Sequence, residues 1–139
     1  MPTPQDPAAA FAAFLGDIPV ARSLGFDLLA RTDDECTLQM PVADRHLQND
    51  ARVHGGIVAT LADTAAVWLL RPALPVGRGL TSIEFKLNFL RPARADGGAL
   101  RASARLVKRG RTVCVSDVEV HQGVDLVAKG LFTYLVYES

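Results

Sequence analysis

A His-Gly-Gly run in the middle of the chain, His54-Gly55-Gly56, has residue types that could hold a developing negative charge. It opens residues 54–71, a stretch without proline that stops at Pro72 and therefore predicts a helix. The two glycines lack a Cβ, so a reacting carbonyl can approach the unpaired backbone N–H groups there, and the helix dipole favours negative charge. Such donors form an oxyanion hole. The alternative is an ordinary turn into a helix, with the glycines serving conformation and His54 capping or packing.

The predicted helix has two apolar faces on a wheel drawn at 100° per residue. The face with the i, i+3, i+4, i+7 spacing that packs on a sheet comprises Val58, Leu61, Ala62, Ala65 and Leu69. The opposite face is apolar with one exception, and comprises Gly56, Ala59, Asp63, Ala66, Val67 and Leu70. One sheet in a chain of 139 residues can cover only one of these faces. We therefore expect a second copy of the protein, a homodimer partner, to cover the other.

Asp63 is the one ionisable residue on that second face. A buried carboxylate is costly unless it is hydrogen-bonded, and desolvation raises its pKa, so such an acid is a candidate for catalysis. The alternative is an aspartate that bonds nearby backbone or packs near an arginine of the partner. Asp63 follows Gly55 by eight residues, so the helix points the two about 80° apart. An aspartate that works with the Gly55 N–H is therefore expected to belong to the other subunit.

The charges of the chain balance, at fifteen basic and fifteen acidic side chains, but they are unevenly placed. This balance argues against a nucleic-acid partner, which needs a basic excess. Residues 1–50 carry three basic against eight acidic residues, whereas residues 86–111 carry eight basic residues against Asp96 alone. Phosphate groups would suit the second segment, and solvated outer strand faces are the alternative.

The length fits a single domain over residues 1–139, with an apolar fraction of 49% that is ordinary for a globular protein. No apolar run is long enough for a membrane span, and the alanine-rich start does not have the pattern of a signal peptide. With Cys36 and Cys114 far apart and without a ligand cluster, we expect buried thiols in a cytoplasmic protein, a single disulfide being the alternative. Nucleotide, metal and serine-hydrolase motifs are missing, so we expect no metal and no cofactor.

The remaining segments predict an α+β domain in which one long helix lies in an antiparallel sheet of five or six strands. A short helix is expected over residues 7–15, within a helical extension over residues 1–20, and residues 43–53 are expected to form a loop. The predicted strands cover residues 26–32, 36–42, 81–90, 99–107, 112–121 and 125–137. Strict alternation in residues 81–90 places Ile83 and Phe85 on one face and Ser82 on the other.

The chain resembles the hotdog-fold acyl-CoA thioesterases, and most closely their phenylacetate-degradation (PaaI-like) branch, in HLQNDARVHGGIVATLADTA and in GLTSIEFKLNFLRPARADGGALRASARLVKRGRT. The resemblance covers nearly all of residues 20–137. It implies the hotdog fold, in which the long helix is the sausage and the sheet is the bun. It also implies dimers joined edge to edge, often paired again into tetramers, with active sites at the dimer interface.

The resemblance implies roles for individual residues. Asp63 matches the catalytic acid, either as nucleophile on the thioester carbonyl or as general base for water, and the Gly55 N–H matches the donor that polarises that carbonyl. The residues implied to line the same site or to orient the thioester or water are His54, Ser82 and either Gln48 or Asn49, and Gly56 is expected to bind the substrate. The residues implied to contact the phosphates of coenzyme A, itself part of the substrate, are Arg91, Arg94, Lys108, Arg109 and Arg111.

The expected function is hydrolysis of a small aryl- or medium-chain acyl-CoA to the free acid and coenzyme A. One alternative is a hotdog-fold hydratase or dehydratase, although those enzymes work with a His and acid pair in a different motif, and that motif is not found here. The other is a non-catalytic acyl-CoA-binding dimer, which would keep the basic turns but would not need Asp63 or Gln48. The sequence leaves open the acyl group, and dimer versus tetramer.

Overall fold

One six-stranded antiparallel sheet forms the framework of the protein in a computed structural model that describes residues 9–11, 13 and 18–139. The strands are β1 (Asp27–Arg31), β2 (Glu35–Met40), β3 (Arg78–Phe89), β4 (Leu100–Arg109), β5 (Val113–Gln122) and β6 (Asp125–Glu138). They lie side by side in the order β1-β2-β4-β5-β6-β3, and every neighbouring pair is antiparallel. The strands β1 and β3 are therefore the two edges of the sheet.

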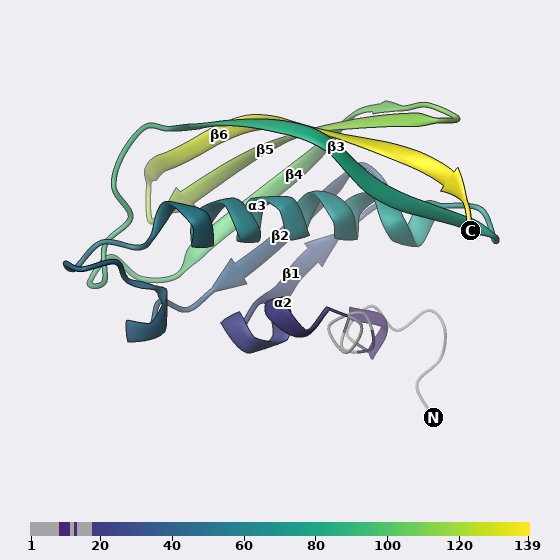
Figure 1. Ribbon diagram of the computed structural model, residues 1–139. Helices are drawn as coiled ribbons and strands as arrows, with labels where there is room; N and C mark the ends of the chain where they lie inside the picture. The colour runs from purple at the N-terminus through teal and green to yellow at the C-terminus, as the bar shows by residue number, and fades with distance from the viewer. Residues whose placement is uncertain (1–8, 12, 14–17) are drawn as a thin grey trace.

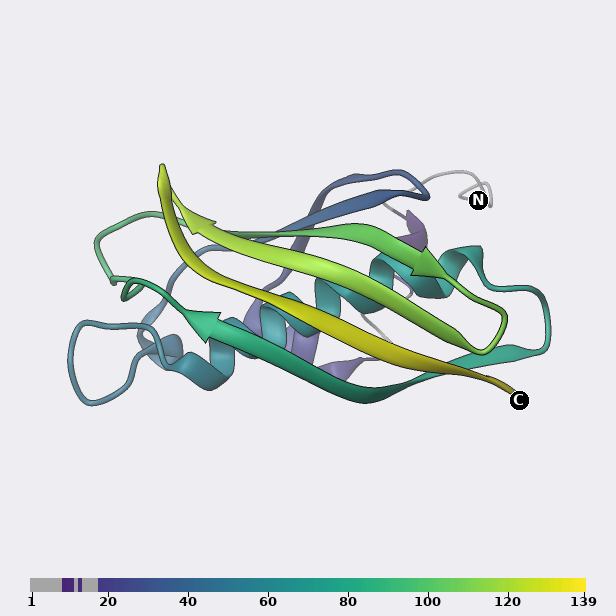
Figure 2. The same ribbon diagram turned by 90° about the horizontal axis from the view of Figure 1, so that it is seen from above.

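The long helix α3 (Gly55–Leu70) lies along one face of this sheet (Figures 1 and 2). Its buried stripe is the one that the helical wheel predicts, with Val58, Leu61, Ala62, Ala65 and Leu69 all at most 2% exposed. Alternate residues of β5 point toward the helix, because Cys114, Ser116, Val118 and Val120 are buried while their neighbours are not. The predicted α+β architecture, one central helix in an antiparallel sheet, is confirmed at six strands.

The opposite face of α3 is covered in part by the chain itself, which corrects the expectation that only a second copy would cover it. Ala66 and Leu70 on this face are fully buried. The short helix α2 (Pro19–Leu24) lies on the side of α3 away from the sheet (Figure 1). Only the first half of this face stays open, where Gly56 is exposed.

Shorter elements fix the two ends of α3. The 3-10 turn η1 (Asp44–His46) precedes it and η2 (Arg71–Ala73) follows it. At its carboxyl end the guanidinium of Arg31 donates to the carbonyl oxygens of Trp68 and Leu69, both at 2.9 Å, so it caps two helix carbonyls.

The sequence prediction did not include α2, and the loop expected over residues 43–53 contains η1 and two isolated bridges. The helix expected over residues 7–15, like the extension over residues 1–20, lies largely outside the described residues. Of it, residues 9–11 and 13 are helical. No helix in the described part of the chain has the length and apolar character needed to cross a bilayer.

Candidate active site

The start of α3 leaves one backbone donor unused. His54 is the N-cap residue, and its Nδ1 accepts the N–H of Gly56 at 2.9 Å. The His54 N–H in turn donates to the carbonyl oxygen of His46 at 2.8 Å. The N–H of Gly55 has no hydrogen-bond acceptor among the residues that the structure describes. His54 is therefore a cap, and the donor available to a ligand here is that of Gly55.

A buried histidine anchors the segment that leads into this helix start. His46 is fully buried, and its Nδ1 accepts the N–H of Ala43 at 2.9 Å. Its Nε2 lies 2.9 Å from the carbonyl oxygen of Leu24, so Nε2 carries the proton and donates. The imidazole ties η1 to the end of α2, and thereby fixes the backbone that receives the His54 N–H.

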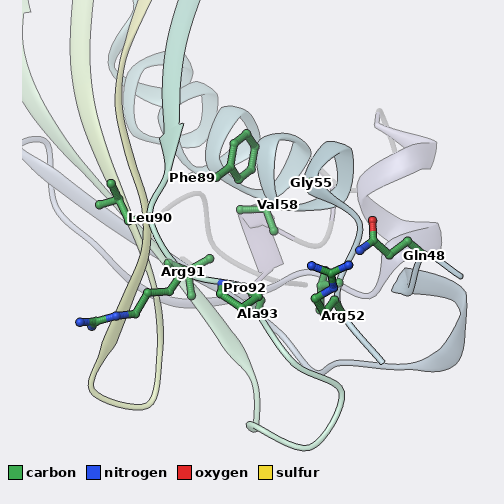
Figure 3. A pocket seen from close by; sticks show the side chains of 11 residues that line it. Gln48, Arg52, Gly55, Val58, Phe89, Leu90, Arg91, Pro92 and Ala93 are labelled. Atoms are coloured by element: carbon green, nitrogen blue, oxygen red, sulfur yellow. The ribbon is translucent and has the colours of Figure 1, made fainter. Parts of the chain in front are cut away.

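Gly55 lines a cavity of about 330 Å³ at this end of the sheet (Figure 3). The apolar part of its wall is formed by Val53, Val58, Phe89, Leu90, Pro92, Ala93 and Val127. Gln48 and Arg52 lie together on one side of it, whereas the guanidinium of Arg91 is directed away from them (Figure 3). A Cβ at position 55 would lie 3.5 Å from the ring of Phe89, an ordinary contact. The cavity thus combines an apolar wall, a polar side and the free Gly55 N–H.

Asp63 is held by a tyrosine that the sequence analysis did not single out. The hydroxyl of Tyr134, in β6, donates to Oδ1 of Asp63 at 2.6 Å. Asp63 is partly buried, and this burial raises its pKa above the ordinary value of 3.8, while the hydrogen bond from Tyr134 opposes the rise. Burial and the nearby carboxylate hold the pKa of Tyr134 far above its usual range, so Tyr134 remains a donor.

Ser82 lies on the helix side of the sheet, which corrects the predicted alternation. Ser82 is the direct cross-strand partner of Tyr134, and directly opposed residues project from the same face of a sheet. The register between β3 and β6 shifts by one residue at Ile83, so Ser82 and Phe85 share the helix face instead of opposing each other. The ring of Phe85 stacks on buried Phe132 at 4.9 Å between centroids.

A single chain does not bring Asp63 and Gly55 together. The eight residues between them correspond to about 12 Å along a helix axis and about 80° around it. Asp63 is turned toward β6, whereas Gly55 opens into the cavity beside the end of β3. The two groups therefore face different parts of the same subunit.

The two residues expected to orient the thioester or water are placed differently. Gln48 lines the cavity with Gly55, and its amide donates a long hydrogen bond of 3.4 Å to Asp50. Asn49 is exposed and does not line that cavity. Arg52, which the sequence analysis did not consider, lies beside Gln48 and pairs with Asp50 at 2.7 Å.

The basic residues expected to bind phosphate fall into two groups at opposite ends of the sheet. Arg91 and Arg94 precede β4, and Arg91 pairs with Asp125 at 3.6 Å. The second group lies at the end of β4 and in the turn that follows it, and comprises Lys108, Arg109 and Arg111. Eight residues of β4, Leu100 to Val107, lie between them, about 26 Å of extended chain. Within one chain the two groups are therefore too far apart to bind the same phosphate.

Each basic group has its own support in the fold. The amide of buried Gln122 accepts from the N–H of Arg94 and donates to its carbonyl oxygen, at 2.8 Å and 2.7 Å, which fixes that turn. At the other end a cavity of about 270 Å³ is lined by Arg109, Arg111 and a third arginine, Arg78. Within the described residues no group of three or more histidine, cysteine or acidic side chains could hold a metal ion.

Comparison with known proteins places this fold in a family. The family model of the thioesterase superfamily matches residues 51–129. A Halobacterium salinarum protein named "Putative esterase" is 36% identical over 83% of this chain and 78% of its own length. The acyl-coenzyme A thioesterase PaaI of Escherichia coli is 29% identical over 72% of this chain and 69% of its own. A thioesterase structure from Haemophilus influenzae superposes with a TM-score of 0.80 at 26% identity, covering 86% of this chain and 82% of that one.

The chain therefore belongs to the thioesterase superfamily, and the helix in its six-stranded sheet is the hotdog fold. It is a thioester hydrolase. Within the superfamily it is PaaI-like, as the resemblance of its sequence predicts.

Proposed function

We propose that this thioesterase hydrolyses a small aryl- or medium-chain acyl-CoA to the free acid and coenzyme A, at a site shared by two copies of the chain. The observation that carries the proposal is the environment of Asp63: a partly buried carboxylate with one neutral donor, Tyr134, and no cation bonded to it among the described residues. Such a carboxylate is basic and oriented, as a proton acceptor or nucleophile must be.

The proposed reaction uses the carboxylate of Asp63 and the N–H of Gly55 on the same thioester. As general base, Asp63 takes a proton from water while the water oxygen bonds to the thioester carbon. The resulting oxyanion accepts the N–H of Gly55. Collapse of this intermediate breaks the carbon–sulfur bond, and the proton on Asp63 passes to the sulfur of coenzyme A. As nucleophile, Asp63 instead bonds to the thioester carbon, the carbon–sulfur bond breaks and coenzyme A leaves as a thiolate that takes a proton from water. Water then hydrolyses the acyl anhydride to the free acid and the Asp63 carboxylate.

A single turnover in ¹⁸O-labelled water separates these two routes. The general-base route places the label in the acid product and none in the protein. Hydrolysis of an anhydride at the Asp63 carbonyl places the label in the Asp63 side chain, which mass spectrometry of the peptide detects. Label in the acid product alone, with no anhydride trapped by hydroxylamine, favours the general base.

The shared site follows from the separation of Asp63 and Gly55 along α3. A partner subunit supplies the missing group if the two copies join through the edge next to Asp63. That edge, β3, has unpaired backbone on one side, and its side chains Ile83, Phe85 and Phe89 are each about half exposed, at 53%, 49% and 54%. An apolar edge strand of this kind favours association with another chain.

Coenzyme A is the proposed thiol part of the substrate, and the arginines are its proposed phosphate ligands. Guanidinium groups bind phosphates in bidentate geometry. The cavity lined by Arg78, Arg109 and Arg111 gathers three of them, and Arg94 is held in place at the other end of the sheet. Escherichia coli PaaI and a mouse relative are both named acyl-coenzyme A thioesterases, which supports the same substrate class here.

The test is incubation of the purified protein with a panel of aryl-acetyl, hydroxybenzoyl and fatty acyl-CoAs and a thiol reagent. Release of free coenzyme A is expected, and Asp63→Asn should lower turnover at least about 100-fold while leaving the oligomer unchanged in size. Wild-type turnover in Asp63→Asn would refute the role of Asp63. Binding without thiol release would instead support the non-catalytic dimer, and a change in ultraviolet absorbance without thiol release would support a hydratase.

A further inference from the structure

Tyr134 is the residue that touches the proposed catalytic carboxylate and that neither the family resemblance nor the comparisons assign. Its side chain is 1% exposed, and its hydroxyl lies 2.6 Å from Oδ1 of Asp63 and 3.3 Å from the Asp63 carbonyl oxygen. The shorter distance is that of a hydrogen bond strengthened by charge on the acceptor. Oδ2 of Asp63 accepts no hydrogen bond from any residue in the described part of the chain.

The fold fixes the ring of Tyr134 on every side. Tyr134 is paired with Ser82 in β3 and with Cys114 in β5, so it lies within the sheet and not at its edge. The neighbours on the same face of β6, Phe132 and Val136, are buried as well. A phenol held this way cannot follow a moving carboxylate, so the hydrogen bond fixes Asp63 rather than the reverse.

We propose that Tyr134 is a positioning residue of this site: its hydroxyl holds Oδ1 of Asp63, which leaves Oδ2 to face the thioester or the attacking water. The inference rests on the proposed function of Asp63. A neutral donor suits this task, because it orients the carboxylate without the large loss of basicity that an arginine or lysine partner causes.

Tyr134 is the titratable side chain that bears on the charge of Asp63. Among the described residues, burial and the Tyr134 hydroxyl are the two influences on the Asp63 pKa. The other titratable or charged groups on the inward face of the sheet are Cys36 and Cys114, which are buried, and Arg31, whose guanidinium bonds the carbonyl oxygens of Trp68 and Leu69 at the end of α3. The charged residues in the middle of the nearby strands occupy the outer face, and comprise Glu84, Lys86, Arg101, Arg105, Asp117, Glu119, His121 and Lys129. Arg78 and Glu138 are cross-strand partners at the far end of β3 and β6. On the elements that flank α3, Arg22 lies in α2 and Arg71 in η2.

The test is Tyr134→Phe, which removes the hydroxyl and keeps the ring. Because a hydrogen bond to a charged group is lost, kcat is expected to fall about 10- to 100-fold with little change in KM. The acid limb of the kcat profile is expected to move to higher pH, since the donor that favours ionised Asp63 is gone. Tyr137→Phe, on the outer face of the same strand, is the matched control and should behave like the wild type.

A second variant covers the case in which Tyr134→Phe does not fold. The chain contains two tyrosines, so 3-fluorotyrosine in the Tyr137→Phe background modifies Tyr134 alone. A more acidic phenol is a stronger donor, and the acid limb should then move to lower pH. If the acid limb of the kcat profile lies at the wild-type pH in both variants, whatever the change in kcat, the proposal is overturned.

A readout without substrate separates this inference from the proposed function. The carboxyl pKa of Asp63, followed by ¹³C NMR in the resting protein, is expected to rise in Tyr134→Phe. If the pKa rises but the wild type hydrolyses no acyl-CoA, the hydrogen bond stands and the proposed function fails. If the wild type is active and Asp63 titrates identically in both proteins, the positioning role fails alone.

Discussion

Replacement of Gly55 by proline would remove the proposed oxyanion donor at little cost to the fold. Gly55 is the first residue of α3, where proline is well tolerated because the N–H makes no bond within the helix. His54 has φ −60° and ψ 132°, a conformation suited to the residue before a proline. The Gly55 N–H has no acceptor among the described residues, so its removal breaks no hydrogen bond within them.

The expected loss in kcat for Gly55→Pro is about 100- to 1000-fold, the effect of removing one oxyanion donor. Gly55→Ala is the matched control, because its N–H remains and its Cβ would meet the Phe89 ring at an ordinary 3.5 Å. Alanine also stabilises a helix relative to glycine by up to about 1 kcal/mol. Activity retained in the alanine variant and lost in the proline variant would assign the effect to the N–H.

Mixing two inactive variants then tests whether the site is shared. In a dimer of one Asp63→Asn chain and one Gly55→Pro chain, one shared site contains both substitutions and the other contains neither. Random reassortment makes about half of the dimers mixed, each with one intact site, so about a quarter of wild-type activity should return. The assay is thiol release after the subunits are exchanged in mild denaturant and refolded together.

Two results would refute this reasoning. Full turnover in Gly55→Pro would show that the Gly55 N–H is not an oxyanion donor. Inactive single variants with no recovery on mixing, although mass spectrometry shows mixed dimers, would show that the two groups act within one chain.

Two stability predictions follow from buried polar groups. Because burial raises the pKa of Asp63, the folded state loses stability as pH rises from 3.8 through the folded pKa. Asp63→Asn should therefore raise Tm at neutral pH but not at acidic pH, in differential scanning calorimetry. Asparagine can still accept from Tyr134, and an equal fall in Tm at both pH values would contradict this. Gln122→Ala would leave the N–H and carbonyl of Arg94 and the carbonyl of Gly98 without their 2.7–2.9 Å partner, and should cost about 1–3 kcal/mol in urea unfolding. A change below about 0.5 kcal/mol, typical of a surface residue, would contradict it.

Features set by local periodicity were predictable from the sequence. The stripe of α3 that faces the sheet was correct because the helical repeat alone determines it. The long strands were correct because their alternation and short turns are also local signals. The helix α2 was missed because six residues, Pro19–Leu24, are too few to show a period. The cover on the second face of α3 depends on α2, which is far away in the sequence.

The candidate site was predictable in its residue types and not in its geometry. The roles of Asp63 and Gly55 came from their spacing and from the resemblance, and they stay predictions. Ser82 was assigned to the wrong face, because nothing in an alternating strand reveals a register shift at Ile83. Tyr134 was missed because its partner lies 71 residues away, and only the folded sheet brings the two together.

The charges of this protein are arranged so that binding and chemistry should respond differently to salt. Asp63 is bonded to a neutral hydroxyl in a partly buried place, where ions in solution screen little. Arg109 and Arg111, proposed to hold the phosphates of coenzyme A, are exposed, and so is Arg94. Rising ionic strength should therefore raise KM for acyl-CoA while kcat stays nearly constant. A fall in kcat at constant KM would mean that the exposed arginines act on the reacting atoms rather than on the substrate's phosphates.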